Sequence, residues 1–208
     1  MIACFEPRWR DWKGRISVQR LLLLLCAVLL YACVGTPTQS LPKKVWSERM
    51  QELQAAQQWD LQGRAAGAVG AQGWQASLEW RQDSQVADVR LAGPLGAGAV
   101  AFRLSPQGMQ LNGASVDTDP NAFLQQRLGF TPPFDNLRFW LLGVPNPQQP
   151  FEFTANAAER AAQITQDGWI IDYGDYMRIG ADWLPKRFSL HRDQVRVRIA
   201  VDRWNIKP

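Results

Sequence analysis

The sequence offers few side chains from which a catalytic site could be built. His191 is the only histidine, and the alternation of its segment places it opposite Phe188 and Leu190, on the side expected to face water. No CxxC or HExxH spacing occurs, and no serine or cysteine can be assigned to this histidine as a nucleophile. A metal centre and a hydrolytic triad are therefore not expected.

Closely spaced carboxylates and one glycine-rich segment have structural explanations. Asp172 and Asp175 flank Gly174 and are expected in a solvated turn at a strand bend, while Asp119 suits the N-cap of a helix. Residues 96–101 fit a GxGxxA pattern, but the segment that follows alternates like a strand. It therefore provides no helix N-terminus that could bind a pyrophosphate. These patterns favour binding over catalysis.

One cysteine stands where a lipid could be attached. Residues 21–31 form an uncharged apolar run after five basic residues, and this run is shorter than the ~20 residues that a membrane-spanning helix needs. The sequence Leu30-Tyr31-Ala32-Cys33 then resembles a bacterial lipobox. Residues 1–32 are thus predicted to be a lipoprotein signal peptide, with Cys33 lipidated after cleavage. The alternative is an uncleaved anchor in which Cys33 is an apolar filler.

Most of the excess positive charge lies in this leader. The whole chain has 23 Lys and Arg against 19 Asp and Glu, whereas without residues 1–32 the counts are 18 and 17. A domain this close to neutrality lacks the basic excess that nucleic-acid binding requires. Cys4 and Cys26 leave with the leader, so the mature chain cannot form an internal disulfide.

After the leader, a tether is followed by a helix and a meander of strands. Residues 33–42 contain Pro, Gly, Ser and Thr without an apolar period, which is typical of a tether before a folded domain at 43–208. Helical spacing from Trp46 to Leu53 predicts a helix over 45–58. Strand alternation is predicted over nine further segments: 59–69, 73–82, 85–93, 98–106, 108–116, 160–169, 169–179, 183–192 and 195–204.

Between the two groups of strands the apolar period is helical. Asp119 and Pro120 suit the start of one short helix, and Gly129 suits its end. A second helix is predicted from Pro133, and it carries the apolar residues Phe134, Leu137, Trp140 and Leu141. Both are too apolar to be exposed on all sides.

This order predicts a mainly β fold with α-helices: an antiparallel half-open, incomplete β-barrel covered by an α-helical lid. A β-sandwich fits less well, because strand residues alone could fill its core. A curled sheet under a helical cover can be solidly packed or can enclose a ligand cavity, and composition does not decide between these.

The turn Pro94-Leu95-Gly96 has an unusual composition. Turns between strands favour Asn, Asp or Ser, whereas this one has a large apolar side chain between Pro and Gly. Leu95 either folds back onto the core or forms an exposed hydrophobic finger, which would indicate contact with a membrane or a lipid.

Several short motifs, taken in order, resemble one known family. They are Trp59-x-x-x-Gly63-Arg64, the strand from Trp74 to Trp80, Gly93-Pro94-Leu95-Gly96, Trp140-Leu141-x-Gly143-x-Pro145, Gln166-Asp167-Gly168-Trp169, Leu184-Pro185 and Trp204. With the lipobox in front, the chain resembles LolB over about residues 43–206. LolB proteins are the outer-membrane receptors of the lipoprotein-sorting pathway in Gram-negative bacteria.

The resemblance implies a half-barrel that accepts the acyl chains of lipoproteins from the periplasmic carrier LolA and incorporates the lipoproteins into the outer membrane. It implies no cofactor and no catalysis. The functional apolar loop residue falls on Leu95, between Pro94 and Gly96, so this turn is the expected membrane-insertion loop. The protein is expected at the periplasmic face of the outer membrane, as a monomer anchored through Cys33.

An apolar cavity under the lid is the expected acyl-chain site. Its predicted lining is Trp74, Leu78, Trp80, Val100, Phe102, Leu104, Phe134, Leu137, Trp140, Leu141, Ile199 and Val201, although each of these could belong to a solid core instead. Two other readings remain open from the sequence: a structural outer-membrane lipoprotein with a packed barrel and no ligand, and a lipid-modifying enzyme.

Overall fold

A computed structural model describes residues 46–111, 114–115 and 120–206. The predicted signal peptide, the predicted tether, Cys33 and the predicted helix cap at Asp119 lie outside the described residues. The chain from Lys44 to Pro208 forms one compact unit, and this unit contains the whole hydrophobic core of the described chain.

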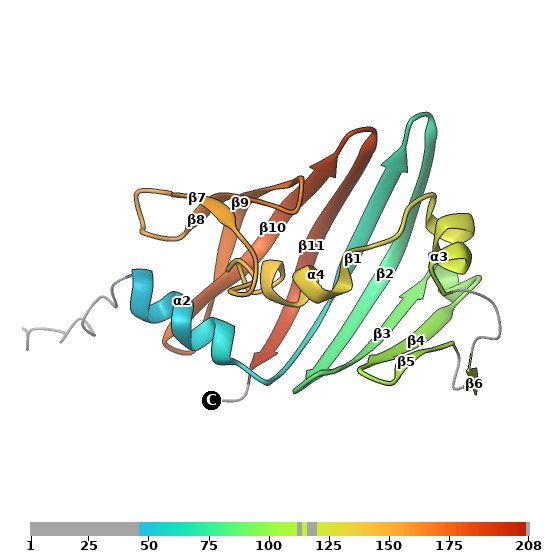
Figure 1. Ribbon diagram of the computed structural model, residues 1–208, viewed down its shortest axis with the longest axis horizontal. Coiled ribbons are helices and arrows are strands. Elements are labelled where there is room, and N and C mark those ends of the chain that lie inside the picture. The colour runs from blue at the N-terminus through green and yellow to red at the C-terminus, as the bar shows by residue number, and fades with distance from the viewer. Residues whose placement is uncertain (1–45, 112–113, 116–119, 207–208) are drawn as a thin grey trace, which may run out of the picture. The chain divides into compact units, whose positions relative to one another are not determined.

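The unit is built on a single antiparallel sheet of 11 strands (Figure 1). These are β1 (Gln58–Val69), β2 (Gln72–Asp83), β3 (Val86–Ala92), β4 (Val100–Ser105), β5 (Gly108–Leu111), β6 (Ala114–Ser115), β7 (Phe151–Ala155), β8 (Ala161–Gln166), β9 (Trp169–Ile179), β10 (Asp182–Arg192) and β11 (Val195–Ile206).

The strand order explains why the barrel stays half open. The order is β6-β5-β4-β3-β2-β1-β11-β10-β9-β8-β7, so the first and last strands pair at the centre and β6 and β7 are the two edges. The helices α3 (Pro120–Leu128) and α4 (Phe134–Trp140) lie in the chain that joins these edges, and α2 (Trp46–Ala55) precedes the sheet. The predicted half-open barrel with a helical lid is confirmed, and α4 crosses the face of the sheet in Figure 1.

Strand alternation places apolar residues on the face that the helices cover. On β2, Leu78 and Trp80 are buried while Glu79 and Arg81 are exposed, as period-two alternation requires. The same period-two alternation buries every second residue along β11 from Val197 to Val201. The predicted stop of α3 is also confirmed, since Gly129 has φ +81° and its N–H donates to the carbonyl of Gln125 at 2.9 Å.

Four local predictions were wrong. The single strand predicted over 108–116 is instead the antiparallel pair β5 and β6, with Leu111 opposite Ala114. The first helix ends at Ala55, because Gln58 already pairs with Asp83 in the sheet. Asp172 and Asp175 lie within β9, where a register shift opposite them in β10 takes the place of the expected turn. Strand β7 was missed, since it is short and pairs only with β8.

Helix α2 is fixed to the half of the sheet that contains β7 and β10 by specific contacts (Figure 1). The ring of Trp46 stacks on Phe153 of β7 with centroids 4.3 Å apart. Arg49 forms an ion pair with Asp182 at 3.3 Å and also donates to the carbonyl of Trp183. Because these partners lie on β7 and at the start of β10, α2 packs beside the edge of the sheet that β7 forms.

Candidate functional site

An apolar cavity of about 70 Å³ lies between the sheet and its cover. Residues from seven strands form its wall: Ala65, Trp74, Leu78, Trp80, Val89, Leu91, Phe102, Trp169, Leu190, Val197 and Ile199. The cover contributes Leu128, Phe130, Pro132, Pro133, Phe134, Leu137 and Leu141. Every lining residue is apolar or aromatic, so the cavity suits hydrocarbon and offers no charged group to a ligand.

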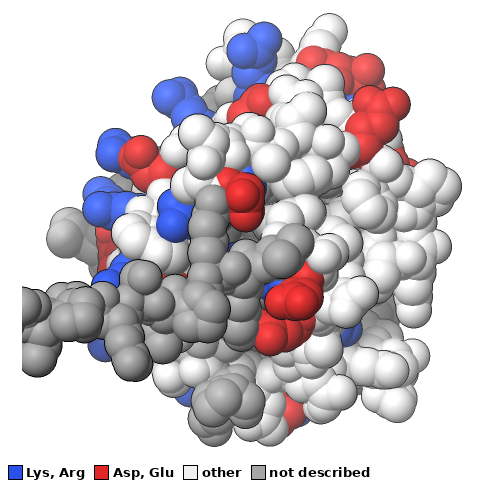
Figure 2. Space-filling model, turned by 90° about the vertical axis from the view of Figure 1, so that its left-hand side faces the viewer, with Lys and Arg blue, Asp and Glu red and all other residues white. Residues whose placement is uncertain are grey.

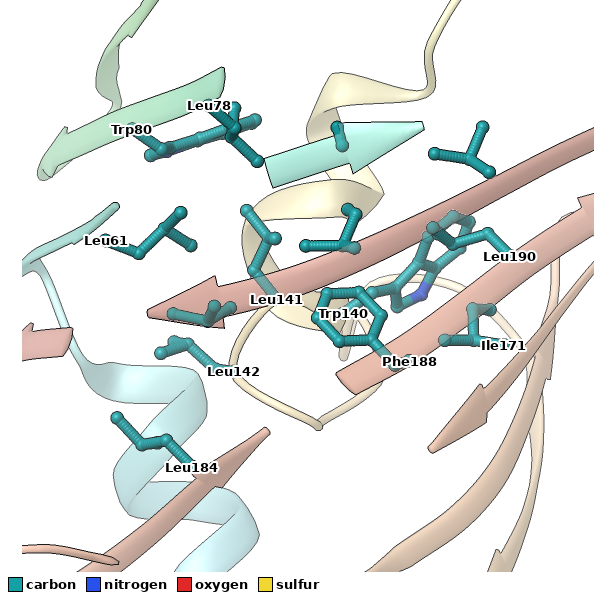
Figure 3. Packing of buried hydrophobic residues seen from close by; sticks show 14 of the residues in the cluster. Leu61, Leu78, Trp80, Trp140, Leu141, Leu142, Ile171, Leu184, Phe188 and Leu190 are labelled. Atoms are coloured by element: carbon teal, nitrogen blue, oxygen red, sulfur yellow. The ribbon is translucent and has the colours of Figure 1, made fainter. Parts of the chain in front are cut away.

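Helix α4 closes this cavity with aromatic contacts. The ring of Phe134 lies 5.6 Å from that of Phe102 and 6.2 Å from that of Trp80, measured between centroids. In Figure 3, Leu61, Leu78 and Trp80 lie on one side of Leu141, and Ile171, Phe188 and Leu190 lie on the other. The helix end is therefore wedged between the two halves of the curled sheet.

The structure brings together two thirds of the residues predicted to line a cavity. Trp74, Leu78, Trp80, Phe102, Phe134, Leu137, Leu141 and Ile199 all contact this space. Four others do not line it, namely Val100, Leu104, Trp140 and Val201. Trp140 and Val201 are fully buried in solid core, while Val100 and Leu104 lie toward the edge of the sheet and line pockets that are more open to solvent.

Sequence reasoning missed six lining residues on the strands, Leu128 of α3 and three residues between the two helices. Phe130, Pro132 and Pro133 belong to the link between α3 and α4, which carries no periodic pattern. Trp169 was predicted as a strand and turn residue but not as part of the cavity wall. Its position directly after Asp167-Gly168, at the start of a strand that buries alternate residues, is the signal that could have identified it.

A buried polar cluster fixes the C-terminal end of α4. The side-chain oxygen of Gln166 accepts hydrogen bonds from the indole N–H of Trp140 and from the backbone N–H of Asn146, both at 2.9 Å. The amide nitrogen of Gln166 donates to the carbonyls of Asn146 and Gln149, and Asn146 donates to Asn136 at 2.8 Å. Buried groups that are this fully satisfied rigidify their surroundings.

Tyr173 adds a further bond to the same helix end. Its hydroxyl donates to the backbone carbonyl of Trp140 at 2.8 Å. Burial raises the pKa of Tyr173 well above its ordinary value, and the neighbouring Tyr176 contributes in the same direction. The hydroxyl therefore keeps the proton that it donates. The C-terminal end of α4 is anchored to β8 and β9, whereas its N-terminal end at Phe134 contacts the cavity through apolar packing alone.

A glycine on β1 makes room for one wall of the cavity. Gly67 lies opposite Trp74 in the sheet, and a Cβ at Gly67 would lie 2.3 Å from the indole ring. The Gly67→Ala variant is therefore expected to displace Trp74 and to lower the free energy of unfolding by about 1–3 kcal/mol, a usual cost of overpacking.

Thermal unfolding together with tryptophan fluorescence would measure this effect. Gly73→Ala is the matched control. Gly73 pairs with Ala68, next to the Gly67–Trp74 pair, and a Cβ at Gly73 would lie 3.5 Å from the nearest atom. Equal stability of the two variants would show that the Trp74 ring does not need the space above Gly67.

The Pro94-Leu95-Gly96 turn projects a leucine into solvent. Leu95 is fully exposed, with a relative accessibility of 108%, and its backbone is left-handed at φ 57° and ψ 22°. The Gly93 N–H donates to the Ala97 carbonyl at 2.9 Å, which closes the loop at its base. A non-glycine residue in this conformation costs about 1–3 kcal/mol, and such strain clusters at functional positions. The structure thus places Leu95 outside the core.

No charged side chain of the described residues lines the cavity, and several charged pairs lie on the outer surface. The ring of His191 is 3.5 Å from Asp172, and both are about half exposed. Arg64 pairs with Asp202 at 3.0 Å, and Arg187 pairs with Asp175. Figure 2 shows basic side chains along the left edge of one face and acidic ones at its centre and upper right. This face therefore presents both signs of charge.

The described residues contain neither a metal-binding cluster nor a helix suited to span a membrane. Among them, no cluster of His, Cys, Asp and Glu has the geometry to hold a metal ion. None of their helices is both long enough and apolar enough to cross a bilayer. Within the part of the chain that the structure describes, the cavity and the Leu95 turn are the features that suggest a site.

Comparison with known proteins points to a single family. The family profile described as outer membrane lipoprotein LolB matches residues 57–204. The outer-membrane lipoprotein LolB of Alkalilimnicola ehrlichii is 32% identical over 202 residues, which cover 94% of this chain and 99% of that protein. The LolB of Nitrosococcus oceani is 31% identical over 193 residues, covering 89% and 96% of the two chains.

A solved structure agrees at the level of the fold. The LolA superfamily protein NE2245 from Nitrosomonas europaea superposes with a TM-score of 0.50 at 8% identity, over 79% of this chain and 94% of that one. The profile match covers both the wall and the cover of the cavity as well as the Leu95 turn. The chain belongs to the LolB family.

Proposed function

We propose that this protein is a lipid-anchored receptor of the outer membrane that takes up the acyl chains of lipoproteins and passes the lipoproteins into that membrane. The observation that carries this proposal is the all-apolar cavity beneath a helical cover. Support comes from the family, whose members are named outer-membrane lipoproteins. The role is binding and transfer, so we propose no enzymatic activity.

An apolar cavity is what the cargo requires. Each CH₂ of an acyl chain moved out of water contributes about 0.8 kcal/mol, so a lipoprotein with three chains needs a protein interior around them. The cavity of about 70 Å³ describes the closed form, since an apolar cavity of ~150 Å³ holds only one benzene. Loading must therefore enlarge it.

The contacts of α4 indicate which part moves. Its C-terminal end is held by Gln166 and Tyr173 and its middle by the bond from Asn146 to Asn136. Phe134 and the preceding link, by contrast, rest on apolar side chains. Apolar contacts with the wall can be exchanged for equivalent contacts with acyl chains. We infer that the segment from Leu128 to Phe134 lifts, while the Gln166 cluster and the bond between Asn146 and Asn136 hold the rest of α4 in place.

The donor of the cargo is expected to be a periplasmic carrier of the LolA class. A receptor of the lipoprotein-sorting system needs a partner that brings the cargo through water. Transfer requires no energy source if the receptor binds the acyl chains with higher affinity than the carrier does. The exposed Leu95 then contacts the acyl region of the outer membrane, so that the loaded cavity lies close to the lipid that receives the cargo.

Displacement of an apolar fluorescent probe tests the cavity. A chain from residue 33 with Ser at position 33, exported by a cleavable signal without a lipobox, is expected to bind about one probe per molecule and to release it when acyl ligand is added. Its tryptophan fluorescence should change on binding, because Trp74, Trp80 and Trp169 line the space. A folded protein that binds no probe would instead be the structural lipoprotein with a packed core.

Lipid attachment at Cys33 is a separate prediction. In the full chain, Cys33→Ser removes the thiol that receives the diacylglyceryl group, so the protein is expected to stay unprocessed or to leave the membrane fraction. Fractionation and mass measurement of the mature N-terminus would show this. A Cys33→Ser protein that is still cleaved after Ala32 and still firmly membrane-bound contradicts the anchor, with Cys26→Ser as the matched control that should behave like wild type.

A further inference from the structure

Two indole N–H groups at the cavity have no partner. Among the described residues, the buried side-chain nitrogens without a hydrogen bond are Nε1 of Trp74 and Nε1 of Trp169. Both side chains line the cavity. Buried donors are nearly always bonded in native proteins, so an exception requires an explanation.

The other tryptophans of this region show the usual behaviour. The indole N–H of Trp80, which lines the same cavity, donates to Gln82 at 3.0 Å. The indole of Trp140 donates to Gln166, and that of Trp204 donates to the carbonyl of Pro185. The fold therefore supplies hydrogen-bond acceptors for other buried indoles. Among the buried indole N–H groups of the described residues, only those of Trp74 and Trp169, both at the cavity, lack such an acceptor.

Both unpaired donors lie at the same end of the sheet. Trp74 is in register with Gly67, Gly67 with Val197, and Val197 with Leu190. Trp169 belongs to the next row toward the β10–β11 turn, because Leu190 pairs with Ile171, two residues further along β9. The two tryptophans thus flank one end of the cavity from opposite sides of the curled sheet.

The link between α3 and α4 covers this end. Phe130 packs on Trp169 with ring centroids 6.0 Å apart, and a Cβ on Gly129 would lie 3.0 Å from a methyl of Val69 at the end of β1. Leu128 and Pro132 complete the lining there. The donors therefore lie beneath the part of the cover that we expect to lift.

The ring of Trp169 is held in place before any ligand arrives. The guanidinium of Arg192 lies 4.8 Å from its centroid, and Trp140 packs at 6.3 Å. The ring of Trp74 rests against Gly67. Donors fixed in this way lose little entropy when they bond to a ligand, which is the advantage of preorganisation.

We propose that the indole N–H groups of Trp74 and Trp169 bind the carbonyl oxygens that link acyl chains to the cargo. This inference rests on the proposed function and names the part of the ligand that the cavity recognises. The cargo's chains are joined through ester and amide groups, and their carbonyls are the strongest acceptors near the hydrocarbon. The chains fill the apolar interior, and the linkages lie at the end under the lifting segment.

A pair of ligands that differ only in the carbonyl tests this assignment. Dioctanoylglycerol has two ester carbonyls, whereas its dioctyl ether analogue has the same hydrocarbon and only weaker ether acceptors. With the protein starting at residue 33 and Ser at position 33, affinities follow from displacement of the apolar probe. That chain includes the whole compact unit from Lys44 to Pro208. Wild type is expected to prefer the ester by roughly threefold to tenfold for each hydrogen bond formed.

Variants assign the preference to the two tryptophans. Trp169→Phe and Trp74→Phe should each weaken ester binding by that factor and bring it closer to ether binding. Trp80→Phe is the matched control, because its N–H is already bonded to Gln82; it should weaken both ligands alike and keep their ratio. Replacing Trp169 with 3-benzothienylalanine, which has sulphur in place of the N–H, tests the same point where the Phe variant does not fold.

The outcomes separate this inference from the proposed function. Equal affinity of wild type for ester and ether would overturn the hydrogen-bonding role while leaving the apolar cavity intact. An ester preference that survives in both Trp→Phe variants would overturn it as well. Failure of the folded protein to bind either ligand would instead remove the proposed function, and this inference with it.

Discussion

The Trp140→Ala variant is expected to lose about 3–5 kcal/mol of unfolding free energy, the usual cost of deleting a fully buried aromatic side chain. Trp140 has a relative accessibility of 0% and its indole donates to Gln166. Truncation therefore leaves a large void and removes one of the two donors to the Gln166 oxygen. For a domain of this size, the loss corresponds to a fall in melting temperature of about 6–20 °C.

Calorimetry or far-UV circular dichroism would measure the melting temperature. Phe151→Ala is the control, since Phe151 is one of the exposed large apolar residues of the domain and its truncation should change stability little. Gln166→Leu tests the polar half of the same cluster and should also destabilise, because it leaves the N–H groups of Trp140 and Asn146 unpaired. Trp140→Ala with wild-type stability would contradict the anchored end of the lid.

The Leu95→Glu variant is expected to keep wild-type stability within about 0.5 kcal/mol and yet to lose delivery of lipoproteins into liposomes. Leu95 makes no core contact, since it is fully exposed, and surface substitutions usually have effects this small. A carboxylate at the tip opposes entry into the acyl region, where an acidic residue costs up to about 2.5–3.5 kcal/mol. Uptake of cargo from the carrier should continue, because the cavity is unchanged.

Two matched variants make the Leu95 result specific. Leu95→Met keeps an apolar tip and should deliver cargo like wild type. Ala181→Glu adds the same charge to the exposed turn between β9 and β10 and should also deliver normally. Delivery by Leu95→Glu at the wild-type rate would show that the turn does not act at the membrane, and a large loss of stability would show that Leu95 supports the fold.

Most of the fold could be predicted because period-two alternation is a direct consequence of a sheet with one dry face. Trp80 and Val197 were placed on the buried face from their spacing alone, and both are buried. Strand β7 could not be found in this way. Its Phe151 is exposed and its Phe153 packs on Trp46 of α2, far away in sequence, so its pattern depends on tertiary contacts.

The site was harder to predict than the fold, because a cavity wall and a solid core use the same residue types. Nothing in the local sequence distinguishes Leu141, which lines the cavity, from Val201, which is packed against solid core. The roles of buried polar residues could also be recognised only from the three-dimensional structure. Gln166 was interpreted as part of a turn, yet it organises the buried cluster that holds α4. By contrast, Leu95 was identifiable because its residue type is unusual for a turn.

Transfer of cargo is the most direct test of the whole account. A LolA-type carrier loaded with a purified lipoprotein would be mixed with the chain that starts at residue 33 with Ser, and the two proteins would then be separated and assayed for the lipoprotein. We predict that the lipoprotein moves from the carrier to this protein without ATP. A lipoprotein that stays on the carrier, while this protein remains folded, would contradict the receptor function.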